Sequence, residues 1–222
     1  MNWRRTARTC HLATAVVGAF ALTAQLVLVF VGASVLVEED PPSLGTRLLR
    51  FVSYFTVQAN VVVLVDVLGL ARDPGRDGPG WRVLRLAGLI GITVTGVVHW
   101  FWLRPLLDLS GWSYATDKLL HVVVPLMAVI GWFVFGPRPR ITLRVALLAL
   151  IWPVTWLAYT LVMGAATGWY PYPFIDVGAR GGGPVAVASI VIAVAFFALS
   201  GLAGLADRKL PARPARSTAA TG

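Results

Sequence analysis

The residues that could do chemistry in this sequence are a few polar side chains at the ends of long apolar runs. Thr56, Asn60, His99 and His121 all lie in such positions. A threonine hydroxyl attacks a carbonyl carbon when a neighbouring base takes its proton, and a neutral imidazole is the usual base. No Gly-x-Ser-x-Gly motif is present. Ester chemistry therefore depends on whether the fold brings a threonine and a histidine together.

Such a site also needs donors for the negative charge that develops on the carbonyl oxygen, and a group that orients the histidine ring. Asp117 and Asp176 are the candidates for orienting the imidazole. The candidates for binding the substrate or the oxyanion are polar residues at helix ends and in one loop: Gln58, Asn60, His99, Tyr170 and Asp176.

A metal site is the competing chemistry. His99, His121, Asp117 and Asp176 carry nitrogen and oxygen ligands of the kind that bind zinc. No His-Glu-x-x-His motif or comparable spacing supports this alternative. We therefore predict no metal and no other cofactor.

Membrane helices must position these residues. Of the 222 residues, 57% are hydrophobic and 13% are charged, whereas about a quarter are charged in a soluble domain. The apolar runs are continuous, which excludes the alternating segments of a membrane barrel. A membrane helix needs about 20 apolar residues. The stretches that qualify are 13–37, 51–71, 83–103, 119–136, 141–164 and 185–206.

We predict an all-α bundle of six transmembrane helices as a single domain over residues 1–206, followed by a disordered cytoplasmic tail over residues 207–222. Fourteen of the 19 Lys and Arg residues fall on the side of the N-terminus, and cytoplasmic loops carry this excess. Both termini are therefore predicted to be cytoplasmic. The single cysteine, Cys10, excludes an internal disulfide.

The net charge of +9 does not indicate nucleic-acid binding. The arginines stand in short blocks between apolar runs, whereas a nucleic-acid surface is one continuous basic patch. Seventeen Arg against two Lys, with abundant Ala, Val and Gly, suit a GC-rich genome. We expect a multi-pass protein of a bacterial plasma membrane.

Helix geometry places the polar residues in one layer of the outer leaflet. At 1.5 Å per residue, Thr56 lies about 8 Å, His99 about 6 Å and His121 about 3 Å below the outer boundary, with Asn60 one turn below Thr56. The Trp- and Tyr-rich loops 108–117 and 168–176 lie above this layer, either as an aromatic belt or as a lid over an amphiphile site. Asp66 lies in the inner half and receives no role.

Three motifs resemble the androgen-induced and androgen-dependent TFPI-regulating protein family, in span order over most of the chain. They are Phe55-Thr56-Val-Gln58-Ala-Asn60, His121-Val-Val-Val-Pro125 and Tyr170-Pro-Tyr-Pro-Phe-Ile-Asp176. Characterised animal members are membrane threonine hydrolases that cleave fatty acid esters of hydroxy fatty acids. The resemblance implies Thr56 as nucleophile and His121 as general base. The Tyr-Pro-Tyr-Pro-Phe loop matches the bacterial branch better, which implies a different acyl ester.

Two functions are consistent with these observations. The first is hydrolysis of a lipid-like acyl ester in the outer leaflet, with membrane lipids and an amphiphilic ester as partners and no protein partner assigned. The second is a non-enzymatic regulator or scaffold, in which Thr56, Asn60 and His121 only join helices by hydrogen bonds. A transporter is disfavoured because the sequence lacks an inverted repeat and paired broken helices. Hydrolysis requires Thr56 Oγ and a His121 ring nitrogen within about 3 Å, beside a cavity.

Overall fold

Within the part of the chain that the structure describes, six helical stretches are long and apolar enough to cross a membrane. The computed structural model describes residues 3–32 and 42–211, and these residues contain no strand. The six stretches are Trp3–Phe30, Phe55–Arg72, Pro79–Leu106, Gly111–Phe135, Leu143–Thr167 and Gly182–Lys209. The predicted all-α, six-span architecture is confirmed, and the chain is a multi-pass membrane protein.

The two longest helices extend beyond the predicted spans. α1 (Trp3–Phe30) begins before residue 13 because the basic segment at its start contains good helix formers and no helix breaker. α10 (Gly182–Lys209) continues past residue 206 because the buried Asp207 carboxylate accepts the backbone N–H groups of Arg140 and Ile141, at 2.5 and 2.7 Å. Residues 33–37 of the first predicted span and residues 212–222 of the predicted tail lie outside the described residues.

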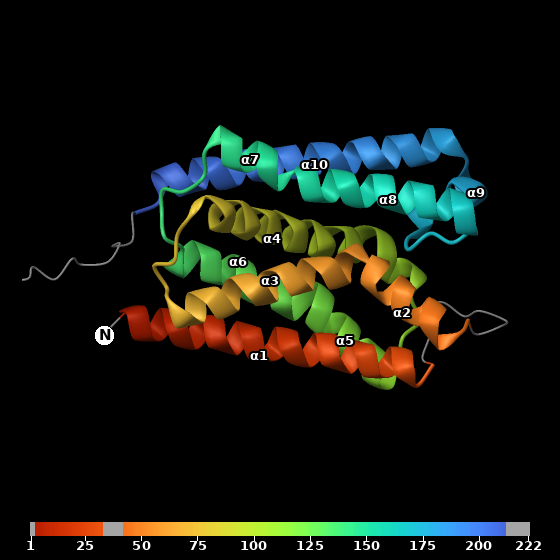
Figure 1. The fold of residues 1–222 in the computed structure, drawn as a ribbon, viewed down its shortest axis with the longest axis horizontal. Coiled ribbons are helices and arrows are strands. Elements are labelled where there is room, and N and C mark those ends of the chain that lie inside the picture. The colour runs from red at the N-terminus through yellow and green to blue at the C-terminus, as the bar shows by residue number, and fades with distance from the viewer. Residues whose placement is uncertain (1–2, 33–41, 212–222) are drawn as a thin grey trace, which may run out of the picture.

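Two central helices hold the bundle together (Figure 1). α3 (Phe55–Arg72) packs between α1 and α4 (Pro79–Val98). α4 also contacts α6 (Val124–Phe135), α7 (Leu143–Ala149) and α10, with α8 (Ile151–Thr167) beside α10. The outer helices expose apolar side chains such as Phe20, Val162 and Phe197. Since a soluble protein would bury such surfaces, they are the lipid-facing sides of the bundle.

The two ends of the bundle carry different elements. The start of α1 and the end of α10 lie at one end, with the α3–α4 and α6–α7 connections (Figure 1). The opposite end carries three short helices, α2 (Leu44–Ser53), α5 (Gly111–Lys118) and α9 (Val177–Arg180). The sequence places the first end in the cytoplasm by its excess of arginine, and this orientation stays a prediction.

The sequence did not predict α2 and α5. α2 is amphipathic, and it begins where the Ser43 hydroxyl accepts the backbone N–H of Thr46 at 3.3 Å. Its apolar side is too short to cross a bilayer, so the search for long apolar runs missed it. α5 occupies most of the segment that we assigned to the third outer loop, and it runs directly into the fourth span. Asp117 therefore lies in a helix rather than in a loop.

His99 and His121 each lie in a π-helical turn. His99 opens the turn η1 (His99–Leu103), in which the Arg104 N–H donates to the His99 carbonyl. His121 lies inside the turn η3 (Leu119–Val123). A proline, Pro105 or Pro125, follows each turn within two residues and cannot donate to the carbonyl four residues back. The widened turns accommodate the missing donors, and π turns are frequent at functional sites.

The orientation of the bundle can be tested by cysteine accessibility. Gly80 and Asp108 lie at opposite ends of the bundle and both are exposed. In a Cys10→Ser background, we expect Asp108→Cys in intact cells to react with a membrane-impermeant maleimide, and Gly80→Cys to react only after permeabilisation. The reverse pattern would show that the termini face outward.

Candidate active site

The site begins at the N-terminus of α3. The chain turns at Tyr54 between α2 and α3, so Thr56 is the second residue of its helix. Phe55 fixes this end by stacking on Trp152 of α8, with ring centroids 4.6 Å apart. Gly91 of α4 allows Trp152 this close, because a Cβ there would lie 2.7 Å from the indole ring. Three helices therefore hold the backbone on which Thr56 is carried.

A chain of hydrogen bonds runs from Thr56 to Asp117. Thr56 Oγ lies 3.2 Å from Nε2 of His121, and His121 Nδ1 lies 3.0 Å from a carboxylate oxygen of Asp117. Nδ1 also lies 3.0 Å from the Asp117 carbonyl. The carboxylate and the backbone carbonyl of Asp117 can only accept hydrogen bonds. Nδ1 therefore carries the hydrogen, and Nε2 is free to accept the Thr56 proton. The order Asp–His–Thr is that of a catalytic triad.

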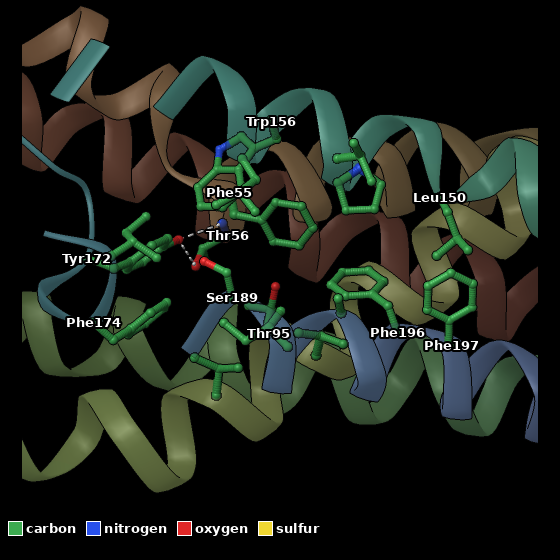
Figure 2. A pocket seen from close by; sticks show the side chains of 18 of the residues that line it. Phe55, Thr56, Thr95, Leu150, Trp156, Tyr172, Phe174, Ser189, Phe196 and Phe197 are labelled. Carbon is green, nitrogen blue, oxygen red and sulfur yellow. Dashed lines mark hydrogen bonds between the residues drawn. The ribbon is translucent and has the colours of Figure 1, made fainter. Parts of the chain in front are cut away.

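Tyr172, from the loop before α9, completes the contacts of Thr56 (Figure 2). Its phenolic oxygen lies 3.1 Å from both the backbone nitrogen and the hydroxyl of Thr56. Because the Thr56 hydroxyl donates to His121, the Tyr172 hydroxyl donates to Thr56 Oγ and accepts the Thr56 N–H. Burial raises the pKa of Tyr172 above its usual value of 10.0, so the phenol stays protonated at neutral and mildly alkaline pH.

Asp117 is shared by three basic side chains. Lys118 Nζ lies 2.8 Å from its second oxygen, and Nε2 of His99 lies 3.3 Å from the same atom. His99 also stacks on His121, with centroids 4.0 Å apart and an interplanar angle of 16°. Besides the Asp117 contact of Nε2, the His99 ring nitrogens have no partner among the described residues, and Nδ1 is unbonded there. His99 is fully buried, so it forms the wall against which the His121 ring is held.

Asn60 donates hydrogen bonds to backbone carbonyls at the second π turn. Its side-chain nitrogen donates to the Thr56 carbonyl at 2.8 Å and to the Leu120 carbonyl at 3.2 Å. Pro125 has no N–H to give to Leu120, and Val124 donates instead to Leu119. Asn60 therefore supplies the donor that the fourth span lacks, and in doing so joins the helix of Thr56 to the turn that carries His121.

Two cavities meet at Thr56 and Tyr172. One, of about 130 Å³, lies among α4, α8 and α10 and is almost entirely apolar. The other, of about 200 Å³, lies under α2 and the loops at the same end of the bundle. Most of its lining is also apolar, and we name it the polar cavity because His99, Asp117 and His121 line it. Thr56 is thus reached from an apolar side and from a polar side, an arrangement that suits an amphiphile with its reactive group between the two.

Three of the predicted site residues lie elsewhere. Gln58 accepts from the Trp152 indole at 2.9 Å and donates to the Val52 carbonyl at 3.0 Å, so it fastens α2 and α8 to α3. The Tyr170 ring packs against Gly164 of α8, which has no side chain to block it. Asp176 caps α9 by accepting the Ala179 N–H at 2.9 Å. These three residues position elements and do not contact Thr56.

Sequence reasoning missed Tyr172. It chose Tyr170 from the same Tyr-Pro-Tyr-Pro segment, and the spacing of a loop gives no periodicity to distinguish two tyrosines. The tertiary environment makes the choice, because the Tyr172 ring stacks on Phe174 and packs against Tyr54 and Trp156, at centroid distances of 5.3 to 5.9 Å. For the histidine, the structure places Asp117 and not Asp176 beside the ring.

A second polar cluster lies in the half of the bundle near the start of α1 and the end of α10. His11, Asp66 and Arg85 line a cavity of about 20 Å³ that also touches Trp132. The volume suits one water molecule, and His11 Nε2, one Asp66 oxygen and Arg85 Nε have no protein partner among the described residues. None of these residues lines either cavity at Thr56. Asp66 is therefore a neighbour of Arg85 and not part of the outer site.

The bridging role of Asn60 predicts a defined loss of stability. Asn60→Leu leaves the buried Leu120 carbonyl without a donor, which costs about 1–2 kcal/mol in a membrane protein. We expect a lower temperature for the loss of monodisperse elution after heating in detergent. Val61→Leu, one residue along and exposed to lipid, should behave like wild type. Equal melting of the Asn60 variant and wild type would contradict the role.

Comparisons with known proteins add no further assignment to this geometry. No family model, curated protein or solved structure matches the chain. The chemistry of the site therefore has to be argued from the distances, burial and residue types of Thr56, Asp117, His121 and Tyr172.

Proposed function

We propose that the protein is a membrane-embedded hydrolase of lipid-like acyl esters, with Thr56 as nucleophile and His121 as general base. The observation that carries the proposal is the 3.2 Å contact between Thr56 Oγ and His121 Nε2, with Asp117 3.0 Å from the other ring nitrogen. A Thr–His contact alone could also serve only to join two helices. The carboxylate on the other ring nitrogen is what favours a nucleophile and its base.

The first half-reaction transfers the acyl group to the protein. His121 Nε2 takes the Thr56 hydroxyl proton as Oγ attacks the ester carbonyl carbon, and a tetrahedral intermediate forms. The bond to the alcohol oxygen then breaks, and His121 returns its proton to that oxygen. Asp117 holds the ring in the required tautomer and stabilises the imidazolium while it exists.

The second half-reaction releases the acid. A water molecule in the polar cavity loses a proton to His121 and attacks the acyl-threonine carbonyl. Collapse of this intermediate breaks the bond to Thr56 Oγ, which recovers the proton from His121. The balance is one ester and one water consumed, with one carboxylic acid and one alcohol formed.

The surroundings of Thr56 support an activated hydroxyl. Its position in the first turn of α3 places Oγ at the positive end of an 18-residue helix, which stabilises developing negative charge. The Tyr172 hydroxyl donates to the same oxygen at 3.1 Å. Thr56 is buried, so these interactions act with little screening by water.

The resemblance to the androgen-induced membrane protein family supports the same two residues. We propose membership of its bacterial branch and residence in a bacterial plasma membrane, with the site in the outer leaflet. An acyl ester of bacterial origin is then a better substrate than a fatty acid ester of a hydroxy fatty acid.

A fluorophosphonate probe tests the activated threonine. We expect the purified protein in detergent to be labelled, and Thr56→Ala and His121→Ala to lose the label. Asp117→Asn should retard labelling by roughly 10³- to 10⁴-fold, because the imidazole then favours the wrong tautomer. Thr160→Ala, a buried threonine on α8, serves as the matched control and should label normally. Each variant is compared by its elution profile.

A wild type that is folded and takes no label would remove support for the hydrolase. The scaffold function would then be preferred, with the Thr56, His121 and Tyr172 contacts serving only to join the helices. His121→Gln keeps a polar side chain of similar length, so a loss of label in both His121 variants separates loss of the base from misfolding.

A second candidate function is metal-dependent hydrolysis. Ligand atoms of His99, Asp117 and His121 lie within 4.8 Å of one another. Two imidazoles and a carboxylate form a donor set that suits zinc, with a fourth position open for water. His99 is consistent with this candidate, because its buried Nδ1 has no partner among the described residues and its Nε2 lies 3.3 Å from the Asp117 carboxylate. With metal bound, His121 would be a ligand and not a base.

Metal analysis distinguishes the two candidates. For the Thr–His–Asp site we expect less than about 0.1 zinc per chain in protein purified with zinc present, and labelling that survives a chelator. The metal site instead predicts about one zinc per chain, lost in a His99→Ala variant. His11→Ala, a buried histidine outside the site, should leave the metal content unchanged.

A further inference from the structure

The apolar cavity beside Thr56 is open to the lipid. It lies among α4, α8 and α10, and the residues at its border include Val154 and Phe197, which are 65% and 61% exposed. Both side chains belong to the lipid-facing surface of the bundle. Figure 2 shows the aromatic and aliphatic side chains that surround the space, with Thr56 and Tyr172 at one end of it. A chain of methylene groups can therefore reach the Thr56 hydroxyl directly from the bilayer.

Two hydroxyl groups interrupt this apolar lining. The remaining polar side chains of the lining all have partners. Thr56 and Tyr172 bond one another, and the Trp156 indole donates to the Ser53 carbonyl at 2.9 Å. The hydroxyls of Thr95 on α4 and Ser189 on α10 are buried and have no partner among the described residues. Figure 2 shows them on the side of the cavity facing Thr56.

Thr160 and Ser200 are also buried hydroxyls without a described partner, but Thr95 and Ser189 differ from them in lining the cavity at Thr56. Thr93, two residues before Thr95 on the same helix, donates to the Leu89 carbonyl at 2.7 Å, which is the usual arrangement. Thr95 does not make this bond, and it lies one helical turn before His99 on the same face of the span. A buried hydroxyl without a partner is costly, so a ligand oxygen that accepts from it is favoured.

We propose that this cavity binds the straight acyl chain of the ester, and that the Thr95 and Ser189 hydroxyls donate hydrogen bonds to its carbonyl oxygen. The inference rests on the proposed hydrolase. A carbonyl carbon attacked by Thr56 lies about 3 Å from Oγ, and its oxygen must find donors in the same space. Thr95 and Ser189 are the lining hydroxyls with no other partner in the described part of the chain.

This placement also assigns the other half of the substrate. With the acyl chain among α4, α8 and α10, the alcohol oxygen faces the polar cavity, where His121 can protonate it. The released alcohol and the incoming water then share the polar cavity, while the acyl-threonine keeps its chain in the apolar one. The substrate class is an ester of an unbranched aliphatic acid.

Straight-chain alkyl fluorophosphonates test both parts of the inference. Thr56 Oγ forms a bond to phosphorus as the P–F bond breaks, fluoride leaves, and His121 takes the proton, with the P=O oxygen in the place of the carbonyl oxygen. The measured quantity is the second-order rate constant of labelling. We expect the rate to rise with the length of the alkyl chain, because each added methylene is buried.

Removal of the hydroxyls should slow labelling without loss of the fold. The variant with Thr95→Val and Ser189→Ala is expected to label roughly 10- to 100-fold more slowly, and Thr95→Ser to stay close to wild type. Thr160→Val on α8 and Ser200→Ala on α10 are matched controls, since both hydroxyls are buried, have no described partner and lie outside the cavity lining. The controls should label at the wild-type rate.

Blocking the cavity gives a second measurement. Ala193→Phe places a ring among the lining residues of α10, and it should abolish the dependence of rate on chain length. Ala198→Phe, on the exposed surface of the same helix, should preserve it. A wild type without label overturns the proposed hydrolase. A labelled wild type overturns this inference alone if the hydroxyl variant keeps the wild-type rate, or if Ala193→Phe keeps the full chain-length dependence.

Discussion

Inside a bilayer every backbone N–H and carbonyl must be paired by the protein. The half of this bundle that carries α2, α5 and α9 is arranged around two places where a proline prevents that pairing. Pro105 and Pro125 withdraw donors from two spans. Each of these spans forms a π turn, which contains His99 in one and His121 in the other. Asn60 from a third span donates a hydrogen bond to the Leu120 carbonyl. The interactions that repair the backbone are also those that bring Thr56 and His121 within 3.2 Å.

Aromatic packing at this end of the bundle holds the start of α3 and the Tyr172 side chain in place. Phe55 stacks on Trp152, which also bonds Gln58, so the start of α3 cannot slide along α8. The Tyr172 ring is held by Phe174, Tyr54 and Trp156, and its hydroxyl is thereby aimed at Thr56. Rings of this kind are expected at any membrane interface. Here their packing determines which hydroxyl donates to the threonine.

Thr56 lies where an apolar and a polar cavity meet, and this position unites the proposed chemistry with the bilayer. In the proposed reaction the acyl chain would enter from the lipid without crossing water, and His121 and Asp117 line the other cavity, which would hold water and the alcohol. The buried hydroxyls of Thr95 and Ser189 and Nδ1 of His99 have no partner among the described residues, and burying such groups is costly. Such local costs are common where a protein binds a ligand, because the rest of the fold compensates for them.

The sequence alone determined the number of spans, because apolar length and the rise per residue fix what can cross a bilayer. It also determined that Thr56, His99 and His121 share one depth, since depth depends on position along the span. It did not determine which side chains face one another. Each π turn adds a residue and rotates the remainder of its helix by about 100°. Beyond residue 119, an α-helical periodicity therefore gives the wrong face for each side chain. Asp117 was selected over Asp176 locally, because it lies four residues before His121 in one continuous helical span. Tertiary packing alone selected Tyr172 over Tyr170.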